Sequence, residues 1–221
     1  KRADYLMEGN RLKQSDGERD LGVIISSSGK PSEQCLAAAK KANRMLGLIK
    51  RNFKSRSKDV VVRLYKTLVR PRLEYCVQSW CPYLQKDIAV LEKVQRRATK
   101  MILACRTDSY EDRLKYTELT SLECRRRRGD MIEVFKLLNG VEKIDYNILI
   151  QRAEKTGRRG HSYKLVKHRA RLDLRKFYFS NRVVNTWNSL PESVVVAGTV
   201  NSFKARLDAY IRAKGSGWFV R

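Results

Sequence analysis

Hydrophobic residues recur every three or four positions along most of this chain, the spacing that predicts amphipathic helices. The clearest stripe runs from Cys35 to Phe53 and predicts a helix that begins after Pro31. Further stripes predict helices after Ser57 or Asp59, over residues 86–104, after Ser109, from Ser121 to Asn139, from Ser180 to Pro191, and around residues 203–211. We expect Pro71 to break or kink the second of these helices, because proline cannot donate a backbone hydrogen bond.

The first 30 residues follow a different pattern. Glycines mark turns, and the apolar run over residues 21–25, bounded by Asp20 and by residues 26–29, predicts a strand. An earlier strand around residues 5–7 is a candidate to pair with it. We therefore predict a mainly α fold, with a short N-terminal β-hairpin followed by a helical bundle and a basic helical C-terminal extension. The expected divisions are residues 1–30, 31–150, 151–182 and 183–221.

Four aromatic residues lie in the second predicted helix and in the segment that follows it, namely Tyr65, Tyr75, Trp80 and Tyr83. Their positions favour packing in the core. Stacking on nucleic-acid bases is the alternative interpretation.

The charge balance indicates the class of partner. The chain has 48 Lys and Arg and 23 Asp and Glu, which give a net charge of +25. Such an excess favours a polyanionic partner, and nucleic acid is the most common one. Residues 40–58 contain eight basic residues and no acidic one. Lys40, Arg44 and Arg51 share the polar face of the first helix, and Lys54 follows it. This face is predicted to contact phosphates, although a solubilising surface would have the same composition.

A second basic ridge is predicted on the third helix, where Arg96, Arg97 and Lys100 cluster opposite the apolar stripe. Later in the chain, four consecutive arginines cannot share one helix face, since successive residues are about 100° apart. We expect Arg127 to point inward and to bind a carboxylate or carbonyl group. The other three, Arg125, Arg126 and Arg128, remain candidates for the polyanion.

The most basic segment covers residues 151–182, with eleven Lys or Arg and two acidic residues. Gly157 and Gly160 enclose Arg158 and Arg159, a loop that suits backbone phosphates but equally suits a mobile linker. The alternation of Arg169, Arg171 and Arg175 with other residues predicts an extended segment that contacts nucleic acid.

The sequence shows no self-sufficient catalytic or metal site. Phosphate-binding loops, nucleophile elbows and zinc-protease motifs are absent, and no cluster of acidic residues suggests a two-metal centre. The five cysteines form no C-x-x-C pair, which favours reduced, mostly buried thiols in an intracellular protein. No apolar run approaches the ~18 residues of a membrane span. Because the chain starts at Lys1, we expect it to lie inside a longer protein.

Seven segments, taken in order, resemble the region after the polymerase core in non-LTR (LINE, jockey-like) retrotransposon reverse transcriptases. They are DLGV (20–23), KANRMLGLI (41–49), LYKTLVRPRLEYC (64–76), LEKVQRRATK (91–100), RRRGD (126–130), FYFS (177–180) and VVNTWNSLP (183–191). The resemblance spans residues 3–211 without large gaps.

This resemblance implies the last strands of the palm, a helical thumb over residues 31–150 and a basic C-terminal extension. The family's enzymes copy element RNA into DNA, and their catalytic aspartates and Mg²⁺ site have no match here. The resemblance therefore implies a chain without its own cofactor or activity that binds RNA and DNA beside the rest of the polymerase, in the nucleus or cytoplasm. A stand-alone nucleic-acid-binding protein derived from such an element, or a fragment without a selected role, are the alternatives.

Overall fold

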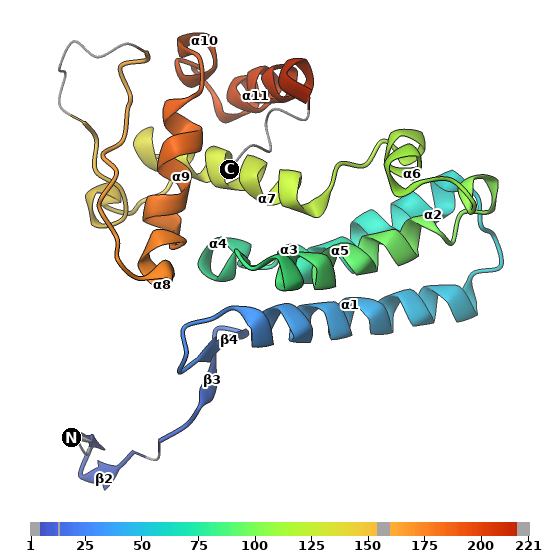
Figure 1. Ribbon diagram of the computed structural model, residues 1–221, viewed down its shortest axis with the longest axis horizontal. Coiled ribbons are helices and arrows are strands. Elements are labelled where there is room, and N and C mark those ends of the chain that lie inside the picture. Colours follow the sequence, from blue (N-terminus) through green and yellow to red (C-terminus); the bar gives the residue numbers. More distant parts are fainter. Residues whose placement is uncertain (1–4, 13, 154–159, 216–221) are drawn as a thin grey trace.

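Helices dominate the computed structural model, which describes residues 5–12, 14–153 and 160–215 (Figure 1). The described elements are β1 (Leu6–Met7), β2 (Asn10–Arg11), β3 (Gly17–Asp20), β4 (Val23–Ser26), α1 (Ser32–Asn52), α2 (Lys58–Leu64), the π-helical turn η1 (Tyr65–Val69), α3 (Arg70–Glu74), α4 (Val77–Trp80), α5 (Gln85–Thr99), the 3-10 turn η2 (Leu103–Cys105), α6 (Tyr110–Thr117), α7 (Leu122–Leu138), the 3-10 turn η3 (Tyr146–Ile148), α8 (Asp173–Lys176), α9 (Phe179–Asn188), α10 (Glu192–Val195) and α11 (Val200–Lys214). The described strands form two small antiparallel hairpins, so the predicted mainly α fold is confirmed.

The N-terminal strands pair differently from the prediction. β3 pairs with β4, and β1 pairs separately with β2. Leu21 and Gly22 have φ angles of 45° and 85° and form the turn between β3 and β4. Positive φ at both central residues is typical of the two-residue turns whose twist matches a hairpin. The predicted strand over residues 21–25 is confirmed only from Val23 onward, because its first two residues form a turn, and its predicted pairing with residues 5–7 is wrong.

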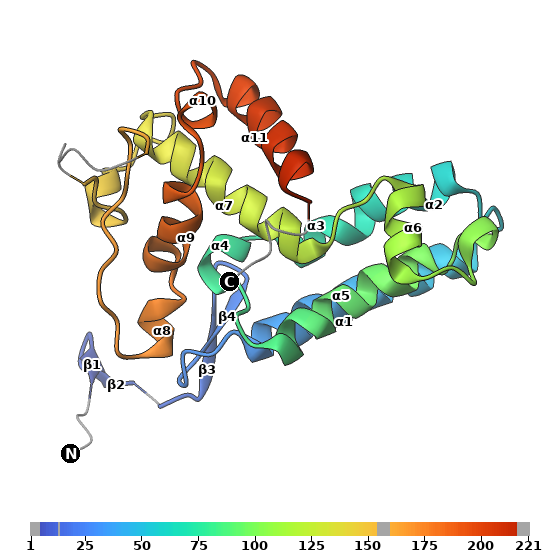
Figure 2. The same cartoon turned by 45° about the horizontal axis from the view of Figure 1, so that its top comes forward.

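The first hydrophobic core lies between α1 and α5, which run side by side (Figure 2). Ala42 is fully buried on α1, and Leu91 and Val94 are fully buried on α5. A small residue at such a position lets the two helices approach closely. The predicted stripe on the first helix is confirmed from residue 35 to residue 49. Phe53 is exposed instead, because α1 ends one residue before it.

The chain between α2 and α5 closes this core. Tyr65 begins the turn η1, and Pro71 stands in the first turn of α3, where a missing N–H group costs nothing. Tyr65 and Trp80 are buried, as predicted for core residues, and Tyr83 is half-buried. Tyr75 departs from the prediction: it is 54% exposed, and its hydroxyl donates to the carbonyl of the turn residue Leu21 at 3.0 Å.

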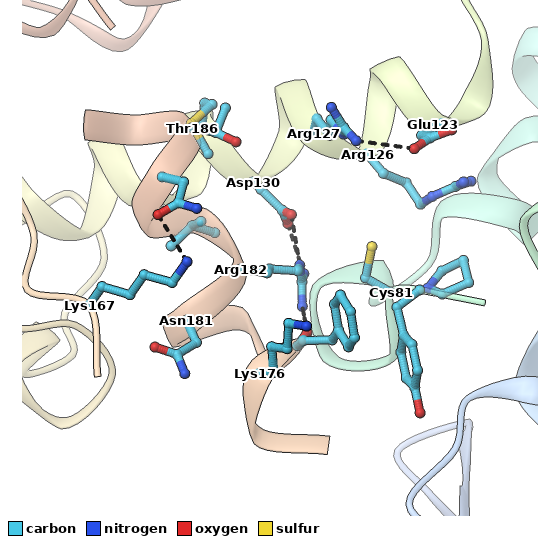
Figure 3. A pocket seen from close by; sticks show the side chains of 16 residues that line it. Cys81, Glu123, Arg126, Arg127, Asp130, Lys167, Lys176, Asn181, Arg182 and Thr186 are labelled. Atoms are coloured by element: carbon cyan, nitrogen blue, oxygen red, sulfur yellow. Dashed lines mark hydrogen bonds and ion pairs between the residues drawn. The ribbon is translucent and has the colours of Figure 1, made fainter. Parts of the chain in front are cut away.

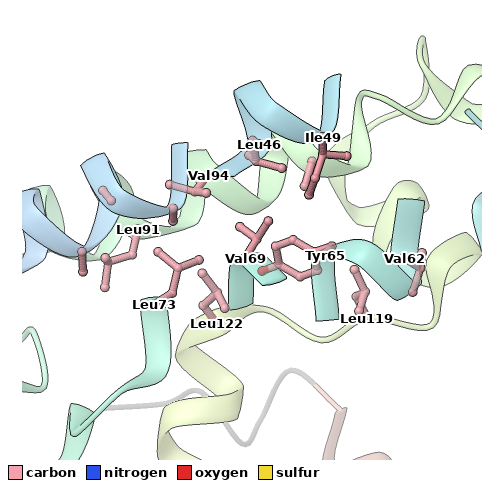
Figure 4. Close-up of a cluster of buried hydrophobic side chains, with 14 of the residues drawn as sticks. Leu46, Ile49, Val62, Tyr65, Val69, Leu73, Leu91, Val94, Leu119 and Leu122 are labelled. Carbon is pink, nitrogen blue, oxygen red and sulfur yellow. The ribbon is translucent and has the colours of Figure 1, made fainter. Parts of the chain in front are cut away.

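Polar groups inside the first core are joined in a network around Gln95, which is fully buried on α5. The Tyr65 hydroxyl donates to Gln95 Oε1 at 2.7 Å. Figure 4 shows Tyr65 among its apolar neighbours. The Gln95 amide donates to the Tyr110 hydroxyl at 2.9 Å and to the Thr120 carbonyl at 3.0 Å. Tyr110 in turn donates to Glu92. Burial raises the pKa of the Glu92 carboxyl above its ordinary value. This network connects η1, α5 and α6.

We predict that Gln95→Ala lowers the free energy of unfolding by about 2 kcal/mol, because a buried donor or acceptor that loses its partner costs about 1–3 kcal/mol. Urea denaturation monitored by circular dichroism measures the difference. Lys93→Ala, at an exposed position of the same helix, is the control and is expected to change stability by less than about 0.5 kcal/mol. Equal stability of the two variants would contradict the structural role of the network.

A second hydrophobic core forms where α7 packs against α9 and α11. Phe135 stacks on Phe203 with ring centroids 4.3 Å apart, and Trp187 is fully buried beside them. Leu122 belongs to the first core, whereas Cys124 belongs to the second. The boundary between the two cores therefore lies within α7. The packing of apolar side chains shows no second boundary near residue 150 in the described part of the chain.

Two predicted helix starts are confirmed by capping hydrogen bonds. The Ser109 hydroxyl accepts from Asp112 N at 3.1 Å, and the Ser121 hydroxyl accepts from Cys124 N at 3.2 Å. Three details differ. The third helix, α5, ends at residue 99 rather than 104, and α9 begins at residue 179, one residue before the expected cap. The segment expected to be extended through Arg175 becomes the short helix α8 from residue 173 onward.

Candidate nucleic-acid interface

A groove of about 660 Å³ lies at one end of the α1–α5 pair and carries positive charge alone. Its lining residues are Asn43, Leu46, Gly47, Lys50, Arg56, Arg97, Lys100, Met101, Leu103 and Arg106. Five of them are cationic and none is acidic. Four separate segments supply these cations: α1, the loop after it, α5, and the turn that follows η2.

Helix ends position the cations. Lys50 stands in the last turn of α1, and Lys100 follows the last residue of α5. The negative end of a helix dipole stabilises cations there. Arg56 folds back over the end of α1, where it donates to the Lys50 carbonyl at 2.7 Å and to the Phe53 carbonyl. Arg97 reaches across from α5 and donates to Asn43 Oδ1 at 3.0 Å.

These five cations have no carboxylate partner among the described residues, whereas Lys58, Arg125, Arg128 and Arg182 each have one. Two of the side chains, Arg56 and Arg97, are held in place by neutral oxygen atoms, which leave their charge uncompensated. The groove therefore offers preorganised donors and net positive charge to an anion. Phosphate oxygens fit these donors, and the lining contains no arrangement that would read bases.

The structure divides the basic ridge predicted on the third helix. Arg97 and Lys100 line the groove on the side of α1. Arg96 lies on the side of α6, with its guanidinium 4.2 Å from the centroid of the Tyr110 ring. Because successive residues on a helix differ by about 100° in direction, neighbours in sequence separate when protein packs on both sides.

The basic residues predicted on the first helix are exposed but do not line the groove. Lys40, Arg44 and Arg51 lie on the solvent side of α1, and Lys54 is exposed in the loop that follows. Sequence reasoning missed Arg56 and Arg106 as groove residues, because both lie in irregular segments where no periodicity shows direction. In the sequence, only the position of Lys50 next to Arg51 connects it with the predicted basic face.

The predictions for the four arginines of α7 are partly corrected. Arg125 is engaged with Glu74, with nitrogen–oxygen distances of 2.5 and 3.0 Å, and this hydrogen bonding raises its pKa. Arg128 binds Asp208. Arg127 has the expected carboxylate partner, Glu123, at 3.3 Å. The most buried of the four is Arg126, at 4% exposure, which removes it from any exposed surface.

The reason for this correction is that α7 is covered on two sides. One face meets α4 and α5, and the opposite face meets α9 and α11. A single apolar stripe in the sequence indicates only the second of these contacts.

The basic C-terminal segment lies apart from the groove. Arg169, Arg171 and Arg175 are exposed near α8, at the opposite end of the molecule from α2 and α6 (Figure 1). Arg158 and Arg159 lie outside the described residues. The structure thus brings Arg97 and Lys100 together with Lys50, Arg56 and Arg106 in the groove. It does not bring Arg169, Arg171 and Arg175 to this groove.

Comparisons with protein-family models, with curated proteins and with solved structures give no match. The resemblance to a reverse transcriptase thus stays a prediction. Within the described part of the chain, no helix is long and apolar enough to cross a membrane. The same residues contain no group of three or more His, Cys, Asp or Glu side chains that could hold a metal ion. A Mg²⁺ site is expected only in the polymerase core that precedes the matching region, and that expectation rests on the resemblance alone.

The cysteines are unpaired, as expected, and three of the five are buried. Burial raises the pKa of Cys35 to about 12 and also raises the pKa of Cys81. A thiolate is the reactive form of cysteine. At neutral pH these two thiols are therefore protonated and poor nucleophiles.

Proposed function

We propose that this chain is the nucleic-acid-binding part of an RNA-directed DNA polymerase of a non-LTR retrotransposon. In this proposal the groove between α1 and α5 holds the phosphate backbone of the primer–template duplex. The observation that carries the proposal is the convergence of five cations from four segments without a single carboxylate. The order of sequence segments that resemble such polymerases supports the choice of this family.

The proposed mechanism is electrostatic. Phosphate oxygens accept hydrogen bonds from Arg56 and Arg97, whose side chains are already positioned, and Lys50, Lys100 and Arg106 add charge at the rim. Each phosphate contact releases condensed counterions into solution. Binding of this kind holds a duplex without selecting its sequence. Its partners are RNA, DNA and the rest of the polymerase, in the nucleus or cytoplasm, and the chain adds no cofactor or catalytic group.

The salt dependence of binding tests this proposal. Five phosphate contacts predict a slope of about −4.5 in a plot of log K against log salt concentration for duplex nucleic acid. Fluorescence anisotropy with an RNA–DNA hybrid, duplex DNA and single strands of equal length measures the slope and the preference. We expect the hybrid or duplex to bind more tightly than single strands. A slope near zero, or equal binding of all forms, would count against a primer–template groove.

A further inference from the structure

A second cavity lies on the other side of the molecule from the groove, between α7, α9 and the chain that follows α4. It has a volume of about 430 Å³, within the ordinary size range of small-molecule sites (Figure 3). Its lining includes Arg126, Asp130, Asn181 and Arg182. The two buried side-chain atoms that lack a hydrogen-bond partner among the described residues, Arg126 Nη2 and Asn181 Oδ1, belong to residues of this one cavity.

Arg126 presents an unsatisfied cationic donor. Its side chain comes from α7 and is 96% removed from solvent, and no atom of the described structure accepts from Nη2. Buried polar groups almost always have a partner, and a buried charge without one is costly. An anionic acceptor in the cavity would satisfy this group. The oxygens of a phosphate group match the geometry of a guanidinium, as those of a carboxylate do.

Asn181, in contrast, presents an unsatisfied hydrogen-bond acceptor. Its Nδ2 donates to the Arg175 carbonyl at 3.3 Å, which fixes the orientation of the amide, because a flipped amide would place two oxygens against each other. Its Oδ1 is left without a donor, and the residue is 5% exposed. A ligand that satisfies both residues must therefore carry an anionic group and, separately, an N–H or O–H donor.

The two unsatisfied residues lie on opposite sides of the ion pair between Asp130 and Arg182 (Figure 3). A ligand that reaches both must be elongated, which disfavours a bare inorganic anion. The lining also includes Phe177, which stacks on Tyr83 with ring centroids 4.4 Å apart and nearly parallel planes. Five cations and two carboxylates line the cavity, so its net charge favours an anion.

We propose that this cavity binds a nucleoside 5′-monophosphate unit, with the phosphate at Arg126 and a donor group of the base or sugar at Asn181. The aromatic and apolar wall accommodates the base. The same chemistry is available from a free nucleotide and from the 5′-phosphorylated end of a strand. The assignment is independent of the groove, because the two sites share no residue.

Isothermal titration calorimetry of the full chain tests the assignment, with the four nucleoside 5′-monophosphates, adenosine, inorganic phosphate, and a trinucleotide with and without a 5′-phosphate as probes. We expect a monophosphate to bind at least 10-fold more tightly than adenosine or phosphate. Binding of the 5′-phosphorylated trinucleotide alone would identify a strand end as the source and would also support the site. Binding of phosphate as tight as that of every nucleotide, or no binding of any probe, would overturn it.

Two variants separate binding from folding. Arg126→Met removes an uncompensated buried charge, so the fold is retained, and we expect nucleotide affinity to fall about 10- to 100-fold. Asn181→Leu is expected to reduce the affinity by a smaller factor, about 5-fold. Arg212→Met, at an exposed position of α11, is the matched control and should leave nucleotide affinity unchanged. Unchanged affinity in Arg126→Met, with circular dichroism showing a folded chain, would overturn the proposal.

Discussion

Reversing the charge of two groove residues together, in Arg97→Glu/Lys100→Glu, is expected to lower the affinity for duplex nucleic acid about 100-fold near 0.1 M salt. Both side chains line the groove, and neither has a carboxylate partner in the described structure. Each lost phosphate contact removes about one unit from the salt slope, so the slope should change from about −4.5 to about −2.7. Fluorescence anisotropy across a salt series gives both quantities.

The control for this variant carries the same change in net charge at another place. Arg212→Glu/Lys214→Glu alters two exposed residues of α11, a helix that lies away from the C-terminal ends of α1 and α5 (Figures 1 and 2). A general effect of net charge would weaken binding equally in both variants, and that result would contradict a localised interface. Circular dichroism of both proteins is expected to match that of the unmodified chain, because all four residues are exposed.

Removing the carboxylate of Asp130 is expected to cost about 3–5 kcal/mol of folding free energy, the loss typical when one partner of a buried ion pair is deleted. Asp130 on α7 binds Arg182 on α9 through two hydrogen bonds of 2.9 Å, and their side chains are 7% and 13% exposed. Arg182 also donates to the carbonyl of Gln78 in α4 at 2.9 Å. Burial alone would lower the pKa of Arg182, but the charge and hydrogen bonds of Asp130 raise it overall.

Urea denaturation of Asp130→Ala measures this loss. Asp208→Ala breaks the pair with Arg128, whose side chains are 28% and 42% exposed for the arginine and the aspartate. This control is expected to cost about 1 kcal/mol or less. The double variant Asp130→Leu/Arg182→Met should recover most of the stability, since an apolar pair of similar volume often replaces a buried ion pair without loss. A small loss of stability in Asp130→Ala would contradict this prediction and would mean that water, and not Asp130, satisfies the charge of Arg182.

The hydrophobic pattern of this sequence was sufficient for the helices and several of their boundaries. The stripe from residue 35 to residue 49 and the caps at Ser109 and Ser121 are local features, because a helix face and a capping hydrogen bond involve residues three or four positions apart. The N-terminal hairpin was less predictable. The polar strand β3 has no apolar alternation, and the first two residues of the apolar run predicted as a strand, Leu21 and Gly22, form the turn of the hairpin.

The sequence by itself therefore determined the helical class, the one-signed charge of the helix faces and the presence of many basic residues that could bind phosphate. Only the tertiary structure decided which of these cations act together. It placed Arg97 toward α1 and Arg96 toward α6. It also brought Arg56 and Arg106, which lie outside the helices, into the lining of the groove, and it buried Arg126 on α7, where other helices pack on both sides. The physical reason is that periodicity shows which residues share a face of one helix, whereas the neighbours of that face are set by packing between segments distant in sequence.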